Sequence, residues 1–447
     1  MLGCSPGRSA VCYVALMRVK FAFGRDGLEL NLPEGFKYQV LEARSAKPLA
    51  EPQSALEKAL DYPIGSASLS ELATGRRSAA ISVCDITRPA PNRFVLPPIL
   101  ARLEKAGIPR ESVTILIATG LHRAATDSEI REIAGPEIAS AYRIVNHNAR
   151  ELTEHRHLGA TRSGTSVYID ERFIAAELHI TLGFIEPHLM LGFSGGRKLI
   201  APGLAAQETI KVLHSPRFMR DHRAVEGSIE DNPLHRELLE IAHMARHDFL
   251  VDVALTRDRK IAGVFAGDAE KAHARGVEFV SEVMLEKLDQ PVDAVITTSA
   301  GYPLDLTFYQ AIKGITAAQH IVRQGGRILL LAECSEGPGA PEFRRMLLEE
   351  PSDGEFLKRI EGAPVTVDQW QLEKLALVTT GKQVLFYTPG LPREYHGSLW
   401  GRAFESPQSA LEALVAGLEP GSRVAVIPEG PYVLAKAGSA ERETVGV

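Results

Sequence analysis

The sequence lacks several features that would assign it to a familiar class of protein. Its 447 residues include only four cysteines, and Cys4, Cys12, Cys84 and Cys334 follow neither a metal-ligand spacing nor a redox motif. Such sparse usage suits a reduced compartment better than a disulfide framework, so we expect a cytoplasmic protein. No apolar run reaches the roughly 18 residues that cross a bilayer, and we therefore expect no membrane association.

The chain also has no surplus of positive charge. Its formal net charge at pH 7 is −6. Because no basic excess exists to neutralise phosphates, we do not expect nucleic acid as a partner and expect a small molecule instead. The length exceeds the size at which one hydrophobic core usually stops growing, which favours two domains.

Apolar runs of strand length alternate with longer helical patterns along most of the chain. This alternation predicts an α/β fold, with two α/β lobes of mainly parallel sheets, linking helices and an active site in the cleft between the lobes. A capping box at Thr126-Asp-Ser-Glu129 marks the start of one helix. The clearest strands are residues 79–84, 113–118, 178–184, 293–298, 327–332 and 423–427, and the clearest helices are residues 94–105, 268–288, 308–322 and 406–418.

These patterns divide the chain into five segments. We expect residues 1–16 to be a leader outside the fold, because their short apolar patch lacks the length and cleavage site of a signal peptide. Residues 17–270 are expected to form an N-terminal α/β domain that holds the cofactor and the catalytic histidines. Residues 271–289 then form a linker helix, residues 290–404 a C-terminal α/β domain, and residues 405–447 a helix and strand that return to the first domain.

Polar residues follow the predicted strands at their carboxyl ends, where open α/β sheets bind ligands. Asp85 and Arg88 follow one strand, His122 the next and His188 a third. Arg88 either pairs with Asp85 in a turn or offers a guanidinium to a carboxylate substrate. A lone histidine in a loop is usually structural, but two at similar strand ends provide a pair of acid/base groups near neutrality.

A glycine-rich stretch follows His188. The segment Gly192-Phe-Ser-Gly195-Gly196-Arg197-Lys198 fits neither the P-loop nor the dinucleotide fingerprint, yet its backbone N–H groups and cations suit an anion. Lys198 is either a solvated cation or a covalent attachment point. His214 is either core filling or a neutral ligand for a metal such as nickel or zinc.

A second group of polar residues lies on the helix predicted after residue 308. Gln310 and Lys313 lie three apart and share a face, which suits either carboxylate binding or an ordinary exposed surface. Individually, none of these motifs decides the function.

Together the motifs resemble those of the nickel-pincer lactate racemase family, from about Asp85 to Trp370. The matching elements are Asp85-x-x-Arg88, Thr-Gly-x-His122-Arg, His188 followed by Gly-Phe-Ser-Gly-Gly-x-Lys198, His214, and Tyr309-Gln310-x-x-Lys313. The spacing from His188 to Lys198 and on to His214 is the one found in that family.

The resemblance implies a covalently bound cofactor, the nickel-pincer nucleotide, which is a pyridinium-3-thioamide-5-thiocarboxylic acid mononucleotide carrying nickel. Lys198 would form the thioamide link, and His214 would be the protein ligand to the metal. Separate maturation proteins would make the cofactor. The other cofactor-binding residues implied are Asp85, Gly195, Gly196, Arg197 and Trp370.

The reaction implied is racemisation of a 2-hydroxy acid by reversible hydride transfer, which avoids a carbanion at C2. One histidine of the pair His122 and His188 would take the hydroxyl proton as the hydride leaves, and the other would act on the opposite face. The substrate-binding residues implied are Arg88, Tyr309, Gln310 and Lys313.

Lactate or another short aliphatic 2-hydroxy acid is the expected substrate. Leu189, Tyr302, Leu304 and Leu306 favour a small or apolar substituent, and no further arginine suggests a second carboxylate. Malate, an aryl-lactate or a sugar acid is the alternative within this family.

Two hypotheses from other functional classes of protein stay open. The first is a metal-dependent hydrolase or lyase that uses His122, His188 and His214, although the tight spacing usual for such sites is absent. The second is a non-catalytic protein that binds a carboxylate between its lobes.

Overall fold

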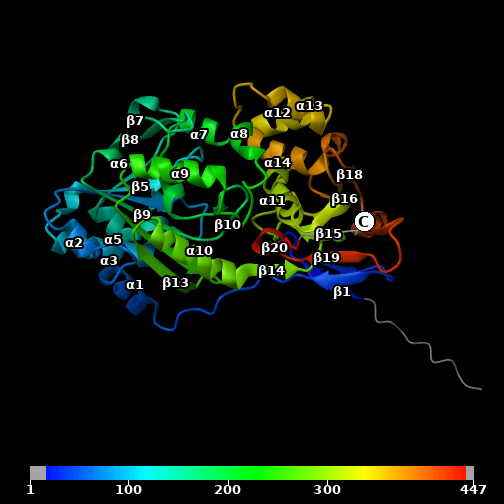
Figure 1. Ribbon diagram of the computed structural model, residues 1–447, viewed down its shortest axis with the longest axis horizontal. Coiled ribbons are helices and arrows are strands. Elements are labelled where there is room, and N and C mark those ends of the chain that lie inside the picture. The colour runs from blue at the N-terminus through cyan, green and yellow to red at the C-terminus, as the bar shows by residue number, and fades with distance from the viewer. Residues whose placement is uncertain (1–16, 439–447) are drawn as a thin grey trace, which may run out of the picture.

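The computed structural model describes residues 17–438 and has two α/β lobes, one blue to green and the other mainly yellow to red (Figure 1). The leader expected at residues 1–16 lies outside the described residues. Each lobe is built on a six-stranded sheet. The predicted α/β class with mainly parallel sheets is therefore confirmed.

The sheet of the first lobe has its most apolar strands in the middle. All residues of β4 and β9 are buried, as expected for central parallel strands with helices on both faces. Only β13 runs antiparallel to its neighbour. The strand order is β13 (Ile261–Gly267), β12 (Phe249–Leu255), β9 (Leu178–Phe184), β4 (Ala79–Cys84), β5 (Val113–Ala118) and β6 (Arg143–Asn146).

Helices cover both faces of this sheet. On one face α1 (Pro52–Asp61), α2 (Leu69–Ala73) and α3 (Asn92–Lys105) pack through buried leucines, isoleucines and valines. On the other lie α7 (Gln207–Leu213) and α9 (Pro233–Met244). The capping box predicted at Thr126 is present, and it starts α4 (Asp127–Ala134).

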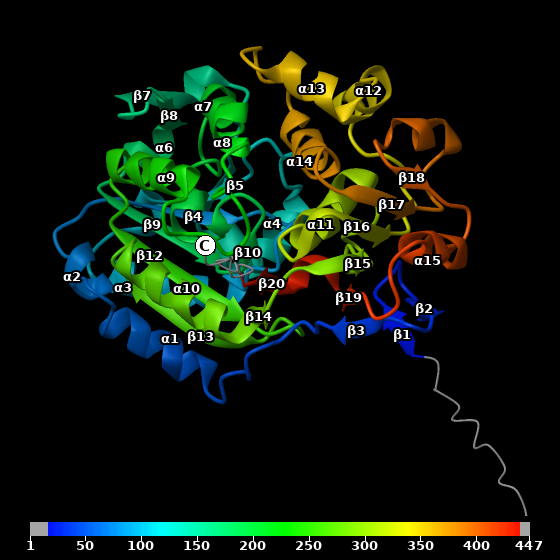
Figure 2. The ribbon, with the colours of Figure 1, turned by 45° about the vertical axis from the view of Figure 1, so that its right-hand side comes forward.

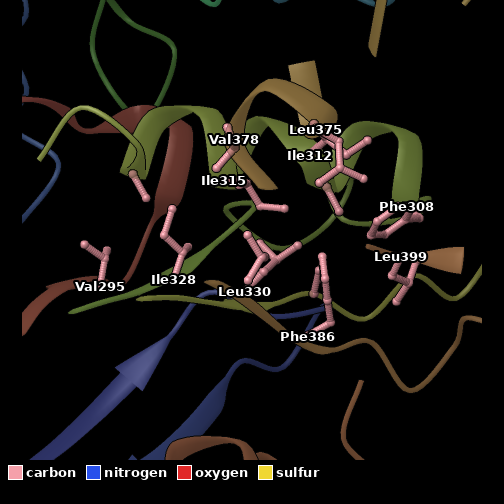
Figure 3. Packing of buried hydrophobic residues seen from close by; sticks show 14 of the residues in the cluster. Val295, Phe308, Ile312, Ile315, Ile328, Leu330, Leu375, Val378, Phe386 and Leu399 are labelled. Atoms are coloured by element: carbon pink, nitrogen blue, oxygen red, sulfur yellow. The ribbon is translucent and has the colours of Figure 1, made fainter. Parts of the chain in front are cut away.

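The second sheet is entirely parallel. Its order is β18 (Arg402–Ala403), β17 (Gln383–Tyr387), β16 (Val322–Leu331), β15 (Val292–Thr298), β19 (Arg423–Ile427) and β3 (Lys37–Val40). One face is covered by α11 (Phe308–Ala318) and α14 (Gln369–Thr379). Figure 3 shows Ile312 and Ile315 of α11 packed over Ile328 and Leu330 of β16. On the other face lie α15 (Pro407–Val415) and the hairpin of β1 (Arg18–Phe21) and β2 (Leu28–Asn31).

The strand pairing corrects two of our expected domain assignments. The segment with β1, β2 and β3 belongs to the second lobe, because β3 pairs with β19 (Figure 2). Residues 405–427 do not return to the first domain either, since β19 lies between β15 and β3. A short apolar strand such as β19 suits the middle of either parallel sheet, so its sequence does not identify its partner.

Two helix boundaries also differ from the prediction. The helix expected to extend to residue 322 ends at Ala318, because Val322 already pairs with Val292 as the start of β16. The helix expected at 268–288 is α10 (Lys271–Met284), which packs against β12 and β13 of the first lobe. Its last residues instead form β14 (Leu285–Leu288), which pairs with β20 (Leu434–Ala437). Across residues 17–438, no helix combines the length and apolarity needed to cross a membrane.

Candidate active site

A cavity of about 1500 Å³ lies between the lobes. The first lobe contributes the loops after β4, β5 and β9, and the second contributes the starts of α11 and α14. Eleven of the thirteen site residues expected from the sequence line it, namely Asp85, Arg88, His122, His188, Gly195, Lys198, His214, Tyr309, Gln310, Lys313 and Trp370. Residues up to 285 positions apart in the sequence thus share one cavity, as the cleft prediction required.

Asp85 and His122 form a hydrogen-bonded pair. Nδ1 of His122 lies 2.7 Å from Oδ2 of Asp85, and the Thr87 hydroxyl donates to Oδ1 at 2.7 Å. Burial alone would raise the pKa of Asp85, but the bonds from His122 and Thr87 and the charge of Arg88 lower it overall. The ionised carboxylate accepts from the Nδ1–H, so in the neutral form of the imidazole Nε2 carries the lone pair. Asp85, expected to contact the cofactor, is therefore the orienting partner of His122 in this structure.

His188 also comes from the first lobe, where it lies in the two-residue strand β10 (Pro187–His188) that pairs with β11 (Gly192–Phe193). The backbone N–H of Met190 donates to its Nδ1 at 3.4 Å. Its pKa is well below the ordinary value, first because of burial and then because of the nearby Lys198, Arg88 and Lys313. The ring is consequently neutral before any anion enters the cavity.

Lys198 belongs to the short helix η3 (Gly196–Leu199), which follows the glycine loop. Burial, together with the charge of Arg88, lowers its pKa to about 7, and the charge of Glu186 opposes the shift. Near neutral pH much of this amine is uncharged, which is the nucleophilic form of lysine.

The Arg197 side chain does not line the cavity. Its guanidinium is buried and points away from the cavity, donating to the carbonyls of Leu191 and Phe193 at 3.1 Å each. It also approaches Nε2 of His273 at 2.7 Å. Gly196 does not line the cavity either. That both lie near the nucleotide phosphate or its tether stays a prediction, and in this structure Arg197 secures the glycine loop.

His214 ends α7 beside the second lobe. Its Nδ1–H donates to the carbonyl of Ile210 at 2.8 Å, which leaves Nε2 available to a ligand. Burial lowers its pKa to about 4, so the ring is neutral, as metal ligation requires. The indole of Trp370 lies 4.5 Å away, measured between ring centroids.

The start of α11 brings three polar side chains to the second wall. Thr307 caps the helix directly after the loop that follows β15. Burial lowers the pKa of Lys313 to about 8, and Arg88 contributes to the shift. Burial also raises the pKa of Tyr309, with the carboxylate of Asp368 adding to it. Oε1 of Gln310 is buried and has no hydrogen-bond partner in the described chain, so it is free to accept from a ligand.

Glu186 and Asp368 also line the cavity and were not among the site residues predicted from the sequence. The negative charge of Glu186 opposes the lowering of the pKa of Lys198 and of Lys313. Asp368 interacts with the Tyr309 hydroxyl and precedes α14 with a left-handed φ of 69°. Glu186 adjoins His188 in Glu-Pro-His and could have been found from that motif, whereas nothing in the sequence marks Asp368.

No group of three or more histidine, cysteine, aspartate or glutamate side chains is arranged to hold a metal within residues 17–438. The three-histidine site considered from the sequence has no support in this part of the chain. A metal that relies on His214 for one ligand would need its other ligands from a bound group.

Family models match both lobes of the chain. Residues 23–227 match the lactate racemase N-terminal domain, and residues 288–435 match the lactate racemase C-terminal domain. The lactate racemase of Thermoanaerobacterium thermosaccharolyticum is 33% identical over 94% of this chain and 100% of its own length. The lactate racemase of Lactiplantibacillus plantarum is 35% identical over 86% of this chain and 91% of its own.

Solved structures agree with this assignment. The lactate racemase apoprotein from T. thermosaccharolyticum superposes with a TM-score of 0.87 at 32% identity, covering 94% of this chain and 100% of that one. A Thermotoga maritima protein with 15% identity and a TM-score of 0.62, covering 88% of this chain and 100% of that one, shares the fold. The chain therefore belongs to the lactate racemase family and is a racemase, an isomerase by class.

Proposed function

We propose that this protein racemises lactate or another short aliphatic 2-hydroxy acid, using a nickel-pincer nucleotide linked to Lys198. The observation that carries the proposal is the joint presence of Arg88, Lys313, Lys198 and the two histidines in one cavity. Two cations that can hold a carboxylate, a lysine that can tether a cofactor and two acid/base groups are what such a racemase of hydroxy acids requires.

The residues fit the proposed cofactor in three respects. Lys198 is a half-buried amine with a pKa of about 7, suitable for forming a thioamide link. Nε2 of His214 is free to bind a borderline-soft metal, and the Trp370 indole beside it offers a flat surface for a pyridinium ring. Oε1 of Gln310 is a buried acceptor without a partner in the described chain. When bound, this group would accept the hydride from C2 of the substrate and return it.

The substrate carboxylate would be held by Arg88 and Lys313. Their mutual repulsion, expressed in the lowered pKa of Lys313, is relieved when an anion binds between them. Holding the carboxylate from both lobes fixes C2 relative to the histidines. Such positioning can lower a barrier by several kcal/mol, on the order of 7–11 kcal/mol for ideal geometry.

Proton transfer would involve His122 and His188 in turn. Nε2 of His122 is kept as an acceptor by the Asp85 bond, so it can take the hydroxyl proton. His188 must gain a proton before it acts as an acid. The substrate carboxylate would offset the charges of Arg88 and Lys313, which lower the His188 pKa in the empty cavity. Reversal of the two roles accounts for racemisation in both directions.

The experiment is intact-protein mass spectrometry after co-expression with nickel-pincer maturation proteins, followed by polarimetry with L-lactate. We expect an adduct on the Lys198 peptide and the appearance of D-lactate. Lys198→Ala should lose the adduct, whereas His122→Ala and His188→Ala should keep it and lose racemisation. Full activity in either histidine variant would contradict the two-base scheme.

Other outcomes would redirect the assignment. An adduct without lactate turnover would retain the cofactor and point to malate, an aryl-lactate or a sugar acid. A loaded protein without turnover of any 2-hydroxy acid would favour a carboxylate-binding role. The cytoplasmic location expected from cysteine usage and the dependence on maturation proteins stay predictions.

A further inference from the structure

Residues 214–228 form a segment that is bonded to both lobes, and we name it the inter-lobe strap. It begins at His214 and contains the short helix α8 (Pro216–Met219). Figure 1 shows α8 next to α14 of the second lobe, in agreement with their packing contacts. Although the strap belongs to the first lobe by sequence, it lies along the boundary.

The first-lobe end of the strap holds the loop that precedes Lys198. The N–H of Gly227 donates to the carbonyl of Gly192 at 2.9 Å. Gly192 has a φ of 75°, and a Cβ there would collide with the Ser228 carbonyl, so the two backbones pack directly. The strap therefore reaches from the proposed metal ligand to the loop carrying the proposed tether.

The second lobe holds the middle of the strap through Lys374 of α14. Its ammonium donates to the carbonyls of Met219 at 3.1 Å and Ala224 at 3.0 Å, and the residue is only 4% exposed. A buried ammonium is costly unless such partners compensate for its lost hydration. Burial lowers the pKa of Lys374, while the charges of Glu226 and Glu373 oppose that shift.

Two further polar links join the strap to the second lobe. Arg220 donates to Glu373 at 3.0 Å, and the Glu373 side chain is fully buried. Glu226 accepts from the Thr316 hydroxyl at 2.9 Å and pairs with His320 at 2.8 Å. These bonds fix the strap against α14 and α11, the helices that carry the second wall of the cavity.

Lys374 follows Trp370 by four residues, so the two side chains lie on the same face of α14. Trp370 in turn contacts the His214 ring. We infer that Lys374 is a positioning residue for His214: it binds the strap to α14 and thereby holds the imidazole against the Trp370 indole across the lobe boundary. The part that concerns the metal at His214 rests on the proposed function. The part that concerns the strap rests on the hydrogen bonds alone.

The first test uses the protein without cofactor and measures hydrogen exchange. Lys374→Met removes the ammonium and keeps the length of the side chain. We expect amides of residues 215–224 to exchange roughly tenfold faster, because local opening then breaks fewer bonds. The control is Lys382→Met, the same change beyond the far end of α14, which should leave these amides unaffected. Unchanged exchange in Lys374→Met would overturn the role of Lys374 in holding the strap.

The second test measures nickel release from the loaded protein during EDTA challenge. Loss of a residue that orients a ligand typically weakens metal binding by about 10–100-fold. We expect release from Lys374→Met to accelerate by a factor in this range, while the mass adduct on Lys198 stays complete. Wild-type retention in this variant would overturn the positioning role. A merely structural defect would reduce the adduct and the nickel together, and that result would also count against it.

A gentler variant covers the case in which Lys374→Met does not fold. Thr316→Val removes only the hydroxyl that Glu226 accepts from, and it should accelerate exchange in the same strap by a smaller factor. If the wild-type protein carries no adduct and no nickel, the proposed function fails and the metal role of Lys374 fails with it. The exchange results would still decide whether Lys374 holds the strap.

Discussion

Replacing Asp85 by asparagine retains the shape of the side chain and removes the charge that orients His122. The bond between them is 2.7 Å long, with the carboxylate 6% exposed and the imidazole 51% exposed. A hydrogen bond to a charged group contributes about 1.5–3 kcal/mol. Solvent around the ring reduces this to roughly 1–2 kcal/mol, since exposed pairs are screened.

A loss of that size predicts a fall in kcat of roughly 5- to 30-fold at neutral pH, because each 1.36 kcal/mol is a factor of ten. An asparagine amide can also donate to Nδ1 of His122 and move the hydrogen to Nε2, which would deepen the loss. The measurement is the initial rate of racemisation, with intact mass as a check on Lys198. Asp258→Asn serves as the matched control, because Asp258 also accepts from a threonine but lies outside the cavity.

Two results would refute this reasoning in different ways. An unchanged kcat in Asp85→Asn would show that the aspartate does not prepare His122 for proton transfer. Failure to form the Lys198 adduct would instead assign Asp85 to the cofactor, as the sequence first suggested. A loss expressed only in KM would indicate a role in substrate binding.

Three further predictions follow from buried groups. Covalent loading should accelerate with pH and level off just above pH 7, because burial lowers the pKa of Lys198 to about 7; a plateau reached only near pH 10 would contradict this. His214→Ala should keep the mass adduct and lose nickel by metal analysis, and retained nickel would exclude His214 as a ligand. Burial raises the pKa of Asp252 to about 7 from an unfolded value near 3.8. The free energy of unfolding should therefore fall as the pH rises from about 4 to 7. Asp252→Asn should therefore raise Tm at pH 8 and not at pH 4, whereas equal changes at both pH values would be inconsistent with this.

The central strands could be predicted almost to the residue. Residues 113–118, 178–184 and 423–427 were expected as strands and match β5, β9 and β19. Their apolar side chains are covered on both faces, which gives a continuous pattern with sharp ends. Lys37–Val40 could not be assigned in this way, because β3 is an edge strand with alternating exposure and its partner lies far along the chain.

The site motifs were predicted better than the directions of individual side chains. Arg197 and Lys198 are neighbours with the same charge, and no sequence feature distinguishes their roles. In the structure they occupy successive positions of a 3₁₀ turn, where consecutive side chains point about 120° apart. One faces the cavity and the other is buried in the loop. Local geometry of this kind depends on Gly195 and Gly196, whose positive φ values of 85° and 47° set the turn.

The motifs are widely spaced in the sequence because the two lobes contribute different residues to one cavity. The first lobe contributes both histidines and the lysine proposed as tether, while Lys313 and Gln310 come from the second. The proposed carboxylate site combines Arg88 of the first lobe with Lys313 of the second, so the substrate contacts both lobes. Catalysis therefore requires the two walls to be correctly placed, and the strap is the segment bonded to both. Beside the apolar packing of Phe218 and Met219, its links include buried hydrogen bonds and ion pairs, which are directional. A directional connection fixes the distance between His214 and Trp370 more closely than apolar packing could.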